Sequence, residues 1–164
     1  MAKAKDNFIE LLLQQVNVMI KKTVLNIRKR IRGIYLKKKR SGLVNKDFSL
    51  ISSNCTGCMI LHDLGLKFNS PFVNLWIAPS DYVKLLSNFK EYMQYRLEFI
   101  EEPGINYPVA LLKDVKIFFQ HYHSTEEAER KWNERASRID YDNLFVLFTD
   151  RDGCTFENLA ACCG

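Results

Sequence analysis

The spacing of the apolar residues changes at Ser41-Gly42, and the chain is built differently on the two sides of this point. From Phe8 to about Leu36, apolar residues recur at steps of three and four, which predicts one long amphipathic helix. After Gly42, short apolar runs alternate with helical stretches, a pattern typical of a sheet covered by helices. The 164 residues leave room for one compact domain beside the helix.

The balance of basic and acidic residues also changes near this point. Residues 1–46 contain 13 Lys or Arg against 2 Asp or Glu, whereas residues 47–164 contain 11 against 17. The net charge of +5 therefore combines a part at +11 with a part at −6. We expect a basic amphipathic helical arm at 1–46 and an α/β domain at 47–164, with an anionic partner for the arm alone.

The cysteines and the first residues bear on cellular location. The five cysteines are odd in number and form two groups, which does not fit a secreted disulfide framework. The stretch 8–20 is interrupted by Glu10, Gln14 and Gln15, unlike a signal peptide, and no apolar run reaches the ~18 residues of a membrane span. We expect a reduced, cytoplasmic protein that can also lie peripherally at the inner face of the membrane.

Two interpretations of the arm are open. Arg28–Arg32 and Lys37–Arg40 place cations beside the apolar stripe, which suits a helix lying on an anionic lipid surface. The same stripe would also suit packing on the rest of the chain or on another copy. Nucleic acid is not expected as a partner, because aromatic residues are nearly absent among the basic ones.

The rest of the chain predicts a mostly parallel sheet with helices on both faces, because strands and helices alternate along it. The helix that starts at Thr56 should end at Gly65, and Ser124 and Glu127 should form a capping box. Ser80 is the expected N-cap of another helix. We expect strands at 48–54, 71–77, 97–100, 109–112, 115–120 and 144–149, and helices at 56–64, 79–92 and 124–139.

Ligands of open α/β sheets bind beyond the carboxyl ends of the strands, so residues that follow strands are the candidate site residues. The first expected strand leads into Asn54, Cys55, Thr56 and Gly57 at a helix start. Free backbone N–H groups and the helix dipole would favour a phosphate there. Simple N-capping by Asn54 or Thr56 is the alternative.

A pair of histidines follows the strand expected at 115–120. In an extended segment, His121 and His123 would point the same way and could bind a metal or act as acid and base. Histidines at strand ends more often serve as structural hydrogen-bonding groups, so this interpretation also stays open.

The segment Asp150-Arg151-Asp152-Gly153 is the sharpest motif. Asp150 and Asp152, after a buried strand, could hold Mg²⁺ or Mn²⁺ against a diphosphate, as in D-x-D glycosyltransferases, while Arg151 offsets phosphate charge. The same letters resemble the nucleophile loop of haloacid-dehalogenase-type phosphatases, although Cys154 interrupts that motif. The alternative is a turn in which one of the two aspartates caps the last helix.

Cys55 and Cys58 have the spacing of a thioredoxin-type redox motif. A zinc site with Cys162 and Cys163 is another formal possibility, although the spacing is not that of a zinc finger. We favour buried, inert thiols, because the order of elements does not suit a thioredoxin fold.

Segments 53–57, 62–77 and 142–155 resemble a bacterial family of uncharacterised proteins that are often labelled exopolysaccharide biosynthesis proteins. The resemblance runs from about residue 47 to the end. It implies an α/β domain with a place in capsule, lipopolysaccharide or exopolysaccharide assembly. The family prefers glycine at the position of Cys58, which further weakens the redox interpretation. Relatives also continue well past residue 155, so the resemblance implies a domain that is incomplete at its C-terminus.

These observations favour a transferase that acts on a sugar or phosphoryl group, with a nucleotide sugar or phosphorylated saccharide as its ligand. A non-catalytic module that docks to the membrane or to assembly machinery is the main alternative. A D-x-D-G phosphatase-like hydrolase is the weakest hypothesis, because the later motifs of that superfamily are missing.

Overall fold

The computed structural model describes residues 2–163, with side chains described for 14–161. The chain separates into two compact units, Met1–Val44 and Asn45–Gly164.

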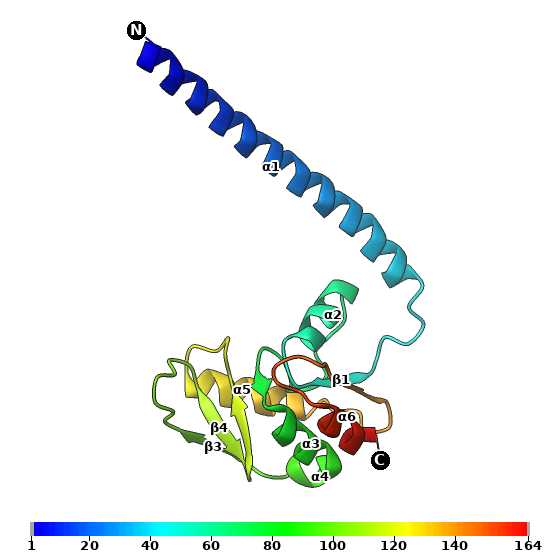
Figure 1. The fold of residues 1–164 in the computed structure, drawn as a ribbon. Helices are drawn as coiled ribbons and strands as arrows, with labels where there is room; N and C mark the ends of the chain where they lie inside the picture. Colours follow the sequence, from blue (N-terminus) through cyan, green and yellow to red (C-terminus); the bar gives the residue numbers. More distant parts are fainter. Residues whose placement is uncertain (1, 164) are drawn as a thin grey trace. The chain divides into compact units, whose positions relative to one another are not determined.

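The first unit is a single long helix, α1 (Ala2–Ser41), continuous in Figure 1. A helix was expected over 8–36, and the structure extends it at both ends. At its C-terminus, the Gly42 N–H and the Ser41 hydroxyl both donate to the Lys38 carbonyl oxygen, at 3.2 and 2.9 Å. The predicted stripe positions Phe8 and Leu12 lie outside the described side chains.

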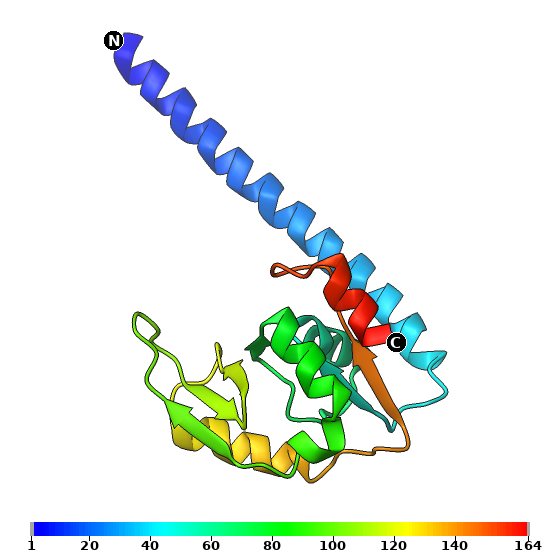
Figure 2. The same cartoon turned by 60° about the horizontal axis from the view of Figure 1, so that its bottom comes forward.

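The second unit contains two small sheets rather than one large sheet. Strands β1 (Ser49–Ser52) and β6 (Leu144–Leu147) form a parallel pair, which Figure 2 shows side by side. The other sheet is antiparallel, with the strand order β2-β5-β4-β3. Its strands are β2 (Trp76–Ile77), β3 (Leu97–Ile100), β4 (Val109–Leu112) and β5 (Val115–Phe118).

The prediction of a mostly parallel sheet was therefore wrong, and the connections give the reason. Parallel strands need a crossover of about a dozen residues or more. Only Lys113 and Asp114 separate β4 from β5, so these strands must form a hairpin, and the 101–108 connection joins β3 to β4 in the same antiparallel way. Lys113 adopts the left-handed region at φ 60°, which closes the tight turn.

Two helix ends agree with their local sequence signals. Helix α2 (Thr56–Leu64) ends at Gly65, whose φ of 69° is the left-handed cap. Helix α5 (Thr125–Ala136) begins after Ser124, whose side chain accepts a hydrogen bond from the Glu127 N–H at 3.2 Å. Both predicted helices are confirmed, although α5 stops before the predicted residue 139.

The helix expected over 79–92 is divided in two. Helix α3 (Pro79–Ser87) and helix α4 (Phe89–Tyr92) are separated by Asn88, which has a non-helical φ of −143°. The N-cap of α3 is Ala78 without a side-chain bond, so the prediction of Ser80 was wrong. Pro79 takes the first helical position instead, where the proline ring fits and its missing N–H costs nothing.

The core joins α5 to the antiparallel sheet. The Trp132 ring of α5 packs against Phe72 and Phe119, with centroid distances of 5.4 and 6.0 Å. Figures 1 and 2 show that α5 lies next to β3 and β4 and crosses them. Tyr82 of α3 is fully buried and meets Phe148, at 5.3 Å, just beyond β6. These contacts link the antiparallel sheet to the strand ends that carry the polar loops.

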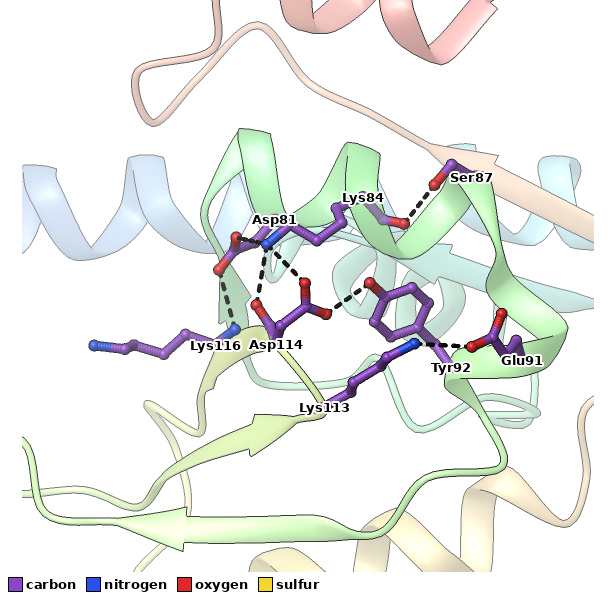
Figure 3. A network of polar contacts seen from close by, with 8 residues as sticks. All are labelled: Asp81, Lys84, Ser87, Glu91, Tyr92, Lys113, Asp114 and Lys116. Atoms are coloured by element: carbon purple, nitrogen blue, oxygen red, sulfur yellow. Dashed lines mark hydrogen bonds and ion pairs between the residues drawn. The ribbon is translucent and has the colours of Figure 1, made fainter.

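A polar network fixes the β4–β5 turn to α3 and α4 (Figure 3). The Tyr92 hydroxyl donates to Asp114 at 2.7 Å, and the Lys84 ammonium lies 3.3 Å from the same carboxylate. Asp81 accepts a hydrogen bond from the Lys116 N–H at 3.0 Å. The network lies at the start of β5, so it leaves the other end of this strand available for a binding site.

Candidate functional site

The parallel pair brings two polar loops together. Because β1 and β6 run in the same direction with Ser52 beside Leu147, the segments that follow them leave the same edge. The Asn54 side-chain amide donates to Thr149 Oγ1 at 2.9 Å and to Asp152 Oδ2 at 3.1 Å. Its oxygen accepts from the Thr56 N–H at 3.0 Å, so one amide side chain connects both loops and the start of α2.

A cleft of about 530 Å³ opens beside these loops, and we call it the main cleft. One part of its lining is polar and comes from the two loops, the start of α2 and Gln120 after β5, whereas the other is mostly apolar and comes from the antiparallel sheet, helix α2 and the 101–108 connection. The lining residues are Asn54, Cys55, Thr56, Arg151, Asp152 and Gln120 on the polar side and Met59, Trp76, Ile105, Tyr107 and Phe118 on the apolar side.

The aromatic side of the main cleft follows from strand register. Trp76 of β2 pairs with Phe118 of β5, and their rings lie 5.0 Å apart in a tilted arrangement. Trp76 is the first residue of β2 and Phe118 is the last residue of β5, so both rings lie at the strand ends that border the main cleft. An aromatic surface beside hydrogen-bonding and charged side chains is typical of sites that hold a ring with polar substituents.

A second cleft of about 660 Å³ adjoins the first. Ile105 and Tyr107 line both, so the 101–108 connection forms their common wall. The second cleft is also lined by His123 and by the acidic residues Glu101 and Glu102. Glu102 is paired with Lys116 at 2.8 Å. Two ligands could therefore lie on the two sides of Tyr107.

The histidines do not meet the aspartates. The strand ends before them, and His121 and His123 are exposed on either side of buried Tyr122. The Tyr122 hydroxyl donates to the Val73 carbonyl oxygen at 2.9 Å and accepts from Arg135 at 2.7 Å, so this residue is structural. Of the two histidines, only His123 is among the residues that line the two clefts.

Asp150 and Asp152 differ in position. Both aspartates are exposed, but Asp152, with a φ of 62°, lines the main cleft, whereas Asp150 is not among the lining residues. Among the described residues, no group of three or more His, Cys, Asp or Glu side chains is placed to hold a metal ion. Mg²⁺ or Mn²⁺ at Asp152 would therefore need further ligands from phosphate oxygens and water, which is how Mg²⁺ often binds.

The helix after this loop is not capped by either aspartate, so that alternative was wrong. Helix α6 (Phe156–Cys163) follows Thr155, whose hydroxyl accepts from the Asn158 N–H at 3.3 Å. The Asn158 side chain in turn accepts from the Thr155 N–H at 3.0 Å. This reciprocal pair leaves both aspartates outside the cap.

The cysteine pair consists of free thiols. Burial raises the pKa of the Cys55 thiol above its ordinary value, and Cys58 and the charge of Asp152 raise it further. Cys58 is buried and its thiol donates to the Cys55 carbonyl oxygen at 3.0 Å. A raised pKa keeps Cys55 protonated at neutral pH, which opposes a nucleophilic or redox role. The side chains of Cys162 and Cys163, which the zinc alternative needs, lie outside the described residues.

Gly57 contacts the strand rather than the cleft. A Cβ at this position would lie 2.7 Å from the Ser52 Cβ, closer than such carbon atoms approach in proteins. The residue therefore allows α2 to pack directly on β1, and it is not among the residues that line the main cleft.

Sequence reasoning missed Trp76, Tyr107, Phe118 and Gln120. Trp76 lay in the 62–77 segment that carried the family resemblance, and Tyr107 is an aromatic residue directly before Pro108, which was a usable signal. Their convergence depends on the antiparallel register of β2 and β5, which the expected parallel sheet did not provide.

The chain belongs to the family described as a domain of unknown function (DUF1919), whose match covers residues 26–162. It is also 44% identical over 133 residues to an uncharacterised protein of Haemophilus influenzae. That alignment covers 81% of this chain and 64% of the relative. Membership in a bacterial family of unknown function is thereby confirmed, and the match reaches back into α1 rather than starting at residue 47. None of the described helices is both long and apolar enough to cross a membrane.

Proposed function

We propose that the second unit binds a nucleotide sugar or phosphorylated saccharide in the main cleft and transfers its sugar or phosphoryl group during surface-polysaccharide assembly. The observation that carries this proposal is the main cleft itself, in which the Trp76–Phe118 pair adjoins Asn54, Arg151 and Asp152. The resemblance of segments 53–57, 62–77 and 142–155 to proteins that are often labelled exopolysaccharide biosynthesis proteins supports the polysaccharide context.

The chemistry of the lining suits such a ligand. The C–H face of a sugar, or a nucleobase, would stack on Trp76 and Phe118, and Asn54 and Gln120 would pair with hydroxyl groups. Arg151 would neutralise part of the phosphate charge. Because the Asp152 carboxylate would repel a bare diphosphate, a Mg²⁺ or Mn²⁺ ion between them would make both charges favourable.

The adjoining cleft would hold the acceptor. For a glycosyl transfer, an acceptor hydroxyl oxygen would bond to the anomeric carbon while the bond from that carbon to the diphosphate oxygen breaks and its electron pair leaves with the diphosphate. The hydroxyl proton would pass to a base, and His123, which lines that cleft, would accept it. His121 lines neither cleft and has no such role in this proposal.

Calorimetric titration tests the binding step. The full-length protein is titrated with nucleotide sugars, sugar phosphates, nucleotides and free sugars, with and without Mg²⁺ or Mn²⁺. We expect a phosphorylated sugar to bind, and the affinity to fall about tenfold or more in Arg151→Gln, since a charged hydrogen bond contributes about 1.5–3 kcal/mol. Arg96→Gln, which removes another exposed arginine, is the matched control and should bind normally.

Absence of binding by every phosphorylated sugar with either metal would overturn the proposal. Equal losses in Arg151→Gln and Arg96→Gln would do the same, because binding would then depend on general charge rather than on the main cleft.

A further inference from the structure

Helix α1 carries an apolar stripe of exposed side chains. Val16, Ile20, Val24, Ile27, Ile31 and Ile34 follow one another at steps of three or four, and all are exposed. At 3.6 residues per turn these positions fall within an arc of about 80°. We call these six residues the α1 stripe. Isolated helices rarely hold together without packing of such a face, so the α1 stripe calls for a partner.

Cations lie on both sides of the α1 stripe. Arg28 follows one edge and Arg30 the other, each about 40° beyond it on a helical projection. No Asp or Glu occurs between Glu10 and Asp47 in the sequence. The helix therefore combines the α1 stripe with flanks that carry only positive charge. Its partner must both cover the apolar side chains and supply negative charge.

Self-association and nucleic acid each satisfy only one of these demands. A second copy of α1 could cover the α1 stripe, but it would bring like charges together along the flanks, which opposes pairing. Nucleic acid would neutralise the cations but would leave isoleucine and valine side chains in water.

The end of the α1 stripe favours lipid over an acidic protein groove. Lys38 stands four residues after Ile34, at the next stripe position, and would be buried in a groove. At a lipid surface its long side chain can reach the headgroups. Tyr35, 57% exposed at the stripe edge with the Lys39 ammonium 5.4 Å from its ring centre, also suits the interface between lipid and water.

We propose that α1 lies on an anionic phospholipid surface, with the α1 stripe in the boundary between headgroups and acyl chains and the flanking cations on lipid phosphates. This inference concerns the first unit alone and does not depend on what the main cleft binds.

Vesicle flotation of the full-length protein tests the inference. Vesicles of phosphatidylcholine alone are compared with vesicles that also contain phosphatidylglycerol. We expect recovery with the anionic vesicles only, falling as salt increases. Each of Lys37→Gln and Lys39→Gln should weaken binding about fivefold, the contribution of one cation near such a surface.

Paired substitutions separate the α1 stripe from general hydrophobicity. The double variant Ile27→Ser and Ile31→Ser keeps every charge. It should bind at least tenfold more weakly, because serine hydroxyl groups replace apolar carbon groups that the lipid would otherwise bury. Leu25→Ser is the matched control. Leu25 is 54% exposed, as Ile27 is at 51%, but it lies on the opposite side of the helix and should not matter.

Several results would overturn the inference: equal recovery with neutral vesicles, no recovery with anionic ones, or losses in Leu25→Ser as large as in the double variant. A dimer in sedimentation analysis that the double variant disrupts would assign the α1 stripe to a second copy instead. Circular dichroism of each variant confirms that α1 remains helical, and a helical double variant that still floats would contradict the role of the α1 stripe.

Discussion

The side-chain amide of Asn54 donates a hydrogen bond of 3.1 Å to the carboxylate of Asp152, 98 positions further along the chain. The contact exists because β1 and β6 are parallel and in register, so that the loops after them meet. The polar side of the main cleft therefore depends on the Asn54 side chain, which bonds to both loops and to the start of α2.

Replacing Asn54 with alanine should loosen the loop after β6. The variant loses its bonds to Thr149, Asp152 and the Thr56 N–H, and at about 1 kcal/mol for each bond we expect a destabilisation of about 1–3 kcal/mol. Urea unfolding measures the loss, and hydrogen exchange should accelerate at residues 149–153. Asn133→Ala, on the exposed side of α5, is the control. Unchanged exchange at 149–153 would contradict the linking role of Asn54.

Gly57→Ala should be strongly destabilising. The new methyl group would meet the Ser52 Cβ at 2.7 Å in a buried contact, and overpacking of this kind costs about 1–3 kcal/mol. Adding Ser52→Gly removes the opposing carbon and should recover part of the loss, which a double-mutant cycle of unfolding free energies measures. Gly33→Ala, where a Cβ meets nothing within 4 Å, should instead be tolerated. Simple additivity of the Gly57 and Ser52 changes would count against direct contact.

Alkylation by iodoacetamide should be slow at Cys55. Because the pKa of this thiol is raised, the thiolate fraction at neutral pH is small, and the rate should rise only at pH values above those of an ordinary cysteine. Asp152→Asn removes one of the charges that raise the pKa, so alkylation should then become faster at the same pH. Mass spectrometry of the Cys55 peptide gives both rates. A fast reaction at neutral pH in the unmodified chain would contradict the interpretation of Cys55 as an inert thiol.

The turn network of Figure 3 should limit stability at both ends of the pH range. The Tyr92 hydroxyl and Lys84 lower the pKa of Asp114, so its stabilising effect is present above about pH 4 and is lost as pH falls through the lowered value. Burial and Asp114 raise the pKa of Tyr92, so its contribution is present below about pH 10 and is lost at higher pH. Thermal melts of Asp114→Asn should show weaker loss of stability on acidification. An acid profile identical to that of the unmodified chain would exclude this carboxylate as a cause.

Local signals predicted most elements well, whereas the pairing of strands that are distant in the sequence could not be predicted from them. The strands at 97–100 and 109–112 and the helix at 56–64 have the expected bounds, because alternation and the Gly65 cap are encoded by neighbouring residues. The sheet type depends on which strands meet. The two-residue connection at Lys113-Asp114 carried that information, but it was outweighed by the general alternation of strands and helices.

The candidate site shows the same division. The expectation that polar residues after parallel strands converge places Asn54 correctly beside Asp152, because β1 and β6 are the one parallel pair among the described strands. His121 and Asp150 lie apart from the main cleft, since β5 ends at Phe118 and the 150–153 turn directs only Asp152 toward Asn54. The aromatic side could not be predicted without the register of Trp76 and Phe118.

Fluorescence of Trp76 tests the ligand assignment most directly. The chain has two tryptophans, and Trp132→Phe leaves Trp76, in the main cleft, as the only one. Titration with nucleotide sugars and Mg²⁺ should give a saturable change in emission that Asp152→Ala and Arg151→Gln weaken and Asp150→Ala leaves intact. No saturable change in a correctly folded variant, or a change that survives both Asp152→Ala and Arg151→Gln, would contradict binding in the main cleft.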